Sequence, residues 1–125
     1  MRFEIKNKSY ASSIMYRVCK GLNISENDIK SGSRIAKVVE ARALICKLLR
    51  DGEECYESIG LVVNRDHSSV IYLVKMHDKY INKSEVYKEH YNLLNSINIT
   101  LSVMDRINYH KNKIEELYKK IIVTF

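Results

Sequence analysis

Apolar residues recur every three or four positions through most of this chain, which is the spacing of amphipathic α-helices. The clearest stripe lies in segment 38–50 and consists of Val38, Ala41, Ile45, Leu48 and Leu49. Charged side chains surround that stripe, and Asp51-Gly52 is expected to end the helix. The pattern therefore predicts one strong central helix.

The same spacing predicts further helices over residues 10–20, 25–29, 53–61 and 66–80. Two later patterns cover 86–97 and 103–121, and 3–8 is expected as a short extended arm. Ser25 followed by Asp28 is typical of a capped helix start. Segment 30–34, Lys-Ser-Gly-Ser-Arg, is expected to form a basic, flexible loop.

Composition agrees with an all-α fold. The 125 residues contain no proline and only four glycines, so the two main helix breakers are scarce. The length suits one compact domain with room for an appendage.

The net charge of +6 and the pI near 9.2 favour a polyanionic partner. Residues 1–52 hold 11 Lys/Arg against 5 Asp/Glu, whereas residues 53–82 hold 3 against 5. We therefore expect phosphate affinity to come mainly from the first half of the chain.

The three cysteines, Cys19, Cys46 and Cys55, are odd in number and lack C-x-x-C spacing. Buried free thiols in a reducing compartment are expected, rather than a metal site. The sequence has no signal-peptide pattern and no apolar run that would span a bilayer, so we expect a cytoplasmic protein with no membrane partner.

The most informative stretch is 64–70, at the start of the 66–80 helix. A short helix, a tight turn after Gly60, and a helix whose first turn carries Asp66, His67 and two serines form the layout of a helix-turn-helix. In that motif the second helix enters the major groove of DNA. Adjacent residues on a helix diverge around its axis, so no Ser/His/Asp relay forms and no catalytic residue is expected.

These residues resemble the C-terminal DNA-binding domain of the bacterial replication initiator DnaA. Its signature G-G-R-D-H-T-T-V is similar to Val63-Asn64-Arg65-Asp66-His67-Ser68-Ser69-Val70. Its P-E-I-G, its S-K-x-R loop and its P-R-x helix start are similar to Glu57-Ser58-Ile59-Gly60, Ser31-Gly32-Ser33-Arg34 and Glu40-Ala41-Arg42. The resemblance covers roughly residues 8–97. It implies a Trp-repressor-like helix-turn-helix domain over 1–97, with 98–125 as an additional C-terminal helical extension.

The resemblance implies a DNA-binding set made of Arg34, Arg42, Arg65, Asp66, His67, Ser68, Ser69 and Lys75. Arg34 matches the loop arginine that reaches the minor groove, while Asp66, His67 and Ser68 match the residues that read the major groove. Arg65 and Ser69 flank the reading residues as phosphate or base contacts, and Lys75 matches a later basic position. Arg42, beside the core stripe, is either a structural charge or a phosphate contact.

Structural or surface roles, without any contact with DNA, are also compatible with several of these residues. Asp66 is equally well placed to cap its helix as to read a cytosine. His67 and Arg34 could be solvated surface side chains, and the hydroxyls of Ser68 and Ser69 could simply support the helix start.

The chain departs from the family signature at the turn, where Val63-Asn64 replaces two glycines. Asn64 can adopt a left-handed conformation, whereas a β-branched valine does so only with strain. Both threonines are serines here, so a methyl group that could pack on thymine is missing, and a site preference different from the DnaA box is expected. His77 replaces an apolar residue and is expected in the core or at its boundary.

The sequence therefore predicts sequence-specific binding of double-stranded DNA without a cofactor. It contains no G-x-x-x-x-G-K-[ST] phosphate loop, so no ATPase activity is expected. Origin recognition and transcriptional regulation both fit, on a host chromosome or on a phage or mobile element.

An interaction module is the main alternative: it keeps the helix-turn-helix as a scaffold and binds a replication partner through its C-terminal helices. The pattern over 103–121 is close to a heptad seam, which fits either a fold-back helix or a homodimer. Structured RNA is a weaker possibility, because the deep groove of A-form RNA excludes a helix.

Overall fold

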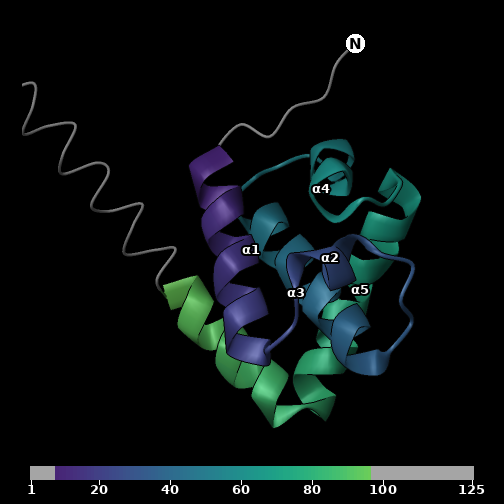
Figure 1. Ribbon diagram of the computed structural model, residues 1–125. Coiled ribbons are helices and arrows are strands. Elements are labelled where there is room, and N and C mark those ends of the chain that lie inside the picture. Colours follow the sequence, from purple (N-terminus) through teal and green to yellow (C-terminus); the bar gives the residue numbers. More distant parts are fainter. Residues whose placement is uncertain (1–7, 97–125) are drawn as a thin grey trace, which may run out of the picture. The chain divides into compact units, whose positions relative to one another are not determined.

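The structure is a computed structural model that describes residues 8–96 (Figure 1). Its helices are Lys8–Leu22 (α1), Glu26–Lys30 (α2), Ala36–Asp51 (α3), Tyr56–Val63 (α4) and His67–Lys83 (α5), followed by a helical segment at 85–96. The described residues contain no strand, which confirms the all-α prediction. The chain divides into two compact units, Met1–Leu94 and Asn95–Phe125, and the five labelled helices lie in the first.

Helix α3 is the centre of that first unit. Nine of its 16 residues are buried: Val38, Ala41, Arg42, Ala43, Leu44, Ile45, Cys46, Leu48 and Leu49. Helices α1, α2, α4 and α5 all contact α3, which explains why its burial is broader than one amphipathic stripe. A helix covered on several sides can carry a charge only where that charge finds polar partners.

Most predicted helices are present, with shifted ends. The prediction that a helix begins at Glu53 was wrong, because Glu53 adopts a left-handed conformation (φ 67°) after α3 and α4 begins only at Tyr56. At the other end of the domain, α1 runs through Gly21 to Leu22, and Asn23 (φ 55°) turns the chain. The predicted arm at 3–8 lies outside the described residues apart from Lys8, and the heptad-like pattern at 103–121 lies wholly outside them.

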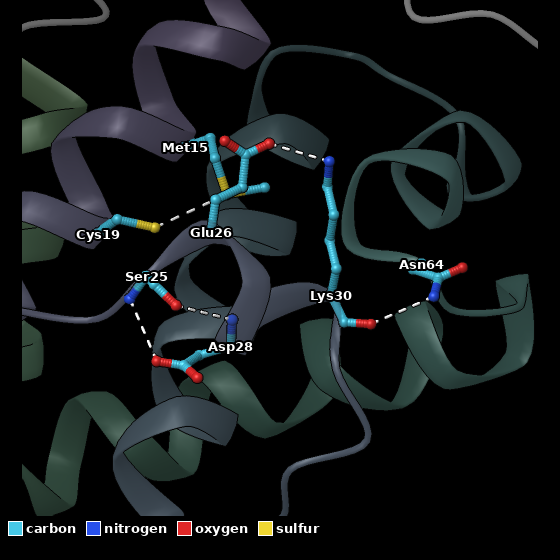
Figure 2. Close-up of polar contacts among 7 residues, drawn as sticks. All are labelled: Met15, Cys19, Ser25, Glu26, Asp28, Lys30 and Asn64. Atoms are coloured by element: carbon cyan, nitrogen blue, oxygen red, sulfur yellow. Dashed lines mark hydrogen bonds and ion pairs between the residues drawn. The ribbon is translucent and has the colours of Figure 1, made fainter.

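The predicted cap of α2 is confirmed. The Ser25 hydroxyl accepts from the Asp28 N–H at 3.1 Å, and the Asp28 carboxylate accepts from the Ser25 N–H at 3.3 Å, which forms a capping box (Figure 2). Two backbone donors that the helix itself leaves unpaired are thereby satisfied.

All three cysteines are free thiols, but only Cys46 is buried as expected. Burial raises the pKa of its thiol to about 12, so the thiol stays protonated. Cys19 and Cys55 are only half-buried: Cys19 lies in the last turn of α1, and Cys55 occupies the N-cap of α4, with its sulfur 3.0 Å from the Ser58 hydroxyl. Within residues 8–96, no helix combines the length and apolarity needed to cross a bilayer.

His77 is buried at 4% exposure, which confirms the core position predicted for it. Its Nδ1 lies 2.6 Å from the Tyr87 hydroxyl, and the Tyr91 ring packs edge-on with a centroid separation of 4.4 Å. Burial raises the pKa of Tyr87, so the hydroxyl stays protonated and donates to an unprotonated Nδ1. Burial, with a smaller contribution from Lys47 that Asp78 and Asp51 partly offset, lowers the pKa of His77. The folded state therefore favours the neutral form of the His77 imidazole.

This packing predicts a loss of stability in mild acid. Because the pKa of His77 is lower in the folded state, the unfolded chain binds more protons as the pH falls through about 6.5, and the free energy of unfolding decreases. His77→Gln keeps an acceptor for Tyr87 but cannot titrate. Urea unfolding between pH 7 and pH 5 should show a smaller pH dependence for His77→Gln than for the wild type. Equal pH dependence in both proteins would assign the effect to other groups.

Candidate nucleic-acid interface

The turn between α4 and α5 is formed by one left-handed residue. Asn64 has φ 57° and ψ 51°, and its N–H donates to the carbonyl of Gly60. Val63 remains the last helical residue and is fully buried, so no β-branched residue has to take a left-handed conformation. The replacement of two glycines by Val63-Asn64 is thus compatible with a tight turn.

Gly60 is required by close backbone packing at this turn. The Arg65 N–H donates to the Gly60 carbonyl at 2.9 Å, and a Cβ on Gly60 would lie 2.3 Å from the Arg65 carbonyl oxygen. The obstructing atom is backbone and cannot rotate away. The glycine therefore lets the chain fold back against α4 and sets the point at which α5 begins.

Asp66 is the N-cap of α5. Its Oδ1 accepts from the Ser69 N–H at 3.3 Å and from the Ser69 hydroxyl at 2.5 Å. The hydrogen bond from the Ser69 side chain is the main reason that the pKa of this exposed carboxylate is lowered. The capping role is confirmed, and it leaves Oδ2 outside the cap, so a role in base reading stays a prediction.

The other reading candidates lie in the first turn of α5. His67 and Ser68 are exposed, whereas Ser69 is half-buried and donates its hydroxyl hydrogen to Asp66. Lys75 is exposed on the same helix, eight residues after His67 and therefore about 12 Å further along the axis. The helix thus presents a polar first turn and a cation two turns later.

The loop between α2 and α3, residues 31–35, carries the exposed Arg34. We predicted a flexible loop, but its serines bond to nearby backbone. The Ser31 hydroxyl donates to the Asp28 carbonyl at 2.7 Å and accepts from the Ser33 N–H at 3.2 Å. The Ser33 hydroxyl accepts from the Ile35 N–H at 3.4 Å. These local turns give the loop a defined conformation.

Arg42 reaches this loop from the inside and is only 4% exposed. Its Nε donates to the Ile29 carbonyl at 2.8 Å, and its terminal nitrogens donate to the carbonyls of Asp28, Ser31 and Ser33 at 3.2–3.4 Å. Burial and the charge of Arg65 lower the pKa of Arg42, although an arginine stays charged at neutral pH. Of the two roles expected for Arg42, these contacts favour the structural one.

The turn reaches the same loop from the outside. The Arg65 guanidinium donates to the carbonyls of Ser31 and Asn64, and the Asn64 amide donates to the Lys30 carbonyl at 3.2 Å (Figure 2). The loop with Arg34 and the beginning of α5 therefore lie on the same side of the domain (Figure 1).

Sequence reasoning missed the loop contacts of Asn64 and Arg42. The available signal for Arg42 was its position beside the apolar stripe of the central helix, since a charge that becomes buried needs polar partners.

The charges at this surface are unevenly neutralised. Lys30 is paired with Glu26 at 2.9 Å. The partners of Arg42 and Arg65 among the described residues are carbonyl oxygens, whose dipoles do not cancel a full charge. The positive charges of Arg42 and Arg65, both bonded to the loop, therefore add to that of the exposed Arg34 and favour an anionic ligand.

A short helix, a turn of one left-handed residue and a capped second helix with an exposed polar first turn define this protein as a helix-turn-helix protein. A comparison with known protein families matches residues 11–76 to the bacterial dnaA protein helix-turn-helix. The chain belongs to this family, and membership indicates DNA binding. A search of curated proteins found no significant match.

The cap predicts a graded effect of substitutions at Asp66. Asp66→Ala removes the acceptor for Ser69 and should lower the thermal midpoint, with faster amide exchange in the first turn of α5. Asp66→Asn keeps a side-chain oxygen at the cap and should stay close to the wild type. Equal midpoints for Asp66→Ala and the wild type would contradict a stabilising cap.

The close approach at Gly60 predicts that Gly60→Ala destabilises the domain by about 1–3 kcal/mol. This clash outweighs the gain in helix propensity of about 1 kcal/mol. Leu61→Ala, on the adjacent and 65% exposed residue, is the matched control and should change the stability little. Denaturant unfolding of both variants measures the difference, and a stabilised Gly60→Ala protein would contradict the prediction.

Proposed function

We propose that this protein binds double-stranded DNA sequence-specifically, with the first turn of α5 in the major groove and Arg34 in the adjacent minor groove. The observation that carries the proposal is the attachment of the Arg34 loop to the helix-turn-helix turn by Arg65 and Asn64. Two exposed polar elements on one side of a basic domain can follow two neighbouring grooves of one duplex.

In this arrangement the reading residues are Asp66, His67 and Ser68. The carboxylate suits a cytosine amino group, and the imidazole suits guanine N7 or O6. Both side chains are presented by a helix start that Asp66 itself caps, so the cap also orients the reading group.

Backbone phosphates would be held by the remaining charges and by the beginning of α5. Lys75 is exposed on the recognition helix, and Arg65 adds its charge at the turn. We propose phosphate contacts for these two residues and for Ser69, whose hydroxyl also serves the cap. Arg42 contributes charge from within rather than direct contact, because its nitrogens bind loop carbonyls.

We propose a role in origin recognition or transcriptional regulation, on a host chromosome or on a phage or mobile element, in the cytoplasm and without catalysis by this domain. Residues 1–97 would carry DNA recognition, and residues 98–125 would form an extension that either folds back or pairs two copies. The serines at positions 68 and 69 lack the threonine methyl groups of the family signature, so the preferred site should differ from the DnaA box.

The test is selection of bound sequences from a random duplex library, with Arg34→Ala and His67→Ala measured on the selected site. Each substitution should cost about 1–3 kcal/mol and relax the preference at the bases it reads. Lys83→Ala is the control: it removes one cation from the other end of α5, about 24 Å from the first turn. It should leave the selected motif unchanged.

The salt dependence provides a second, independent result. Affinity should fall steeply with salt concentration, with a slope set by the number of phosphates contacted. Salt-sensitive binding without any motif would indicate non-specific coating of DNA. No binding would favour the interaction module, which deletion of residues 98–125 would then test through loss of a partner.

A further inference from the structure

The carbonyl oxygens before Arg34 are held from two sides. Arg42 binds those of Asp28, Ile29, Ser31 and Ser33 from within the core. The turn of the helix-turn-helix binds two in the same stretch, with Asn64 on the Lys30 carbonyl and Arg65 on the Ser31 carbonyl. The Ser31 carbonyl thus accepts from both arginines.

This arrangement is costly, and packing alone does not require it. A guanidinium that leaves water needs several hydrogen bonds in return, and an apolar side chain of similar volume would fill the space on α3. An apolar side chain would, however, remove the donor that reaches the carbonyls of Ile29 and Ser33, and the Ser31 carbonyl would keep only the bond from Arg65. The specific effect of the arginine is therefore on the loop.

The last carbonyl that Arg42 holds belongs to Ser33, the residue immediately before Arg34. The backbone is therefore fixed up to the point from which the exposed Arg34 side chain projects. The planar fork of an arginine can hold several carbonyls in one geometry, which the single ammonium of a lysine cannot.

We propose that Arg42 is a positioning residue for DNA recognition: through its bonds to the loop carbonyls it sets the place of Arg34 relative to the first turn of α5. The inference rests on the proposed function, because it assigns Arg42 no contact with DNA: apart from the charge that it adds, Arg42 acts on recognition of the site through Arg34. Without Arg42 the loop must be ordered on binding, and that ordering costs affinity.

The test is a double-mutant cycle on the selected duplex. Arg34→Ala is introduced into the wild type, into Arg42→Met and into Arg42→Lys, and the dissociation constant of each protein is measured. In the wild type, Arg34→Ala should weaken binding about tenfold or more. In both Arg42 backgrounds the same substitution should cost about twofold or less, because Arg34 is no longer held in place.

Arg42→Lys separates positioning from charge. It keeps the positive charge, so its affinity for an unrelated duplex and its salt slope should match those of the wild type. Its affinity for the selected site should nevertheless fall about tenfold, because one ammonium cannot hold four carbonyls. Wild-type affinity for the selected site in Arg42→Lys would overturn the proposal and assign Arg42 a purely electrostatic role.

Amide exchange without DNA gives an independent measurement. In Arg42→Lys the amides of residues 31–35 should exchange faster, while those in the buried part of α3 stay protected. If Arg42→Met does not fold, the lysine background carries the same cycle. An equal cost of Arg34→Ala in the wild type and in Arg42→Lys would overturn the positioning role. Absence of any selected motif for the wild type would instead refute the proposed function itself.

Discussion

Burial of α3 is the constraint on which the rest of the described domain depends. This helix is in contact with α1, α2, α4 and α5, and nine of its residues are shielded from water. The burial of Leu44, Ile45, Leu48 and Leu49 supplies the hydrophobic free energy that holds the short helices α2 and α4 in place. Neither helix is long enough to be stable by itself.

The same burial determines the contacts of Arg42, the charged residue among the buried positions of α3. Because Arg42 lies in the core, its guanidinium has to find polar partners there, and the backbone carbonyls at the end of α2 and in the loop after it provide them. Because the buried guanidinium needs these partners, it also restrains the backbone of the surface loop at residues 31–35. The loop in turn carries an exposed arginine, so the position of that arginine depends on a residue that is itself 4% exposed.

The beginning of α5 is determined by three short-range features. Gly60 admits the backbone of Arg65, Asn64 supplies the left-handed residue, and Asp66 caps the helix. Each feature satisfies a local backbone requirement, and together they leave His67 and the adjacent serine exposed. The polar first turn is thus presented by a rigid support, which lowers the ordering cost of any contact that it makes.

The sequence by itself determined the helical class, the order of the helices, the cap at Ser25 and the helix-turn-helix signature, because periodicity and capping are encoded within a few residues. It could not place the start of α4, since the left-handed conformation of Glu53 carries no signal of its own. Only the tertiary structure decided that Arg42 turns toward the loop and that Asn64 and Arg65 meet it from the other side. Those contacts join residues that lie 9 to 34 positions apart, and no local pattern encodes which carbonyl a guanidinium will meet once the helices have packed.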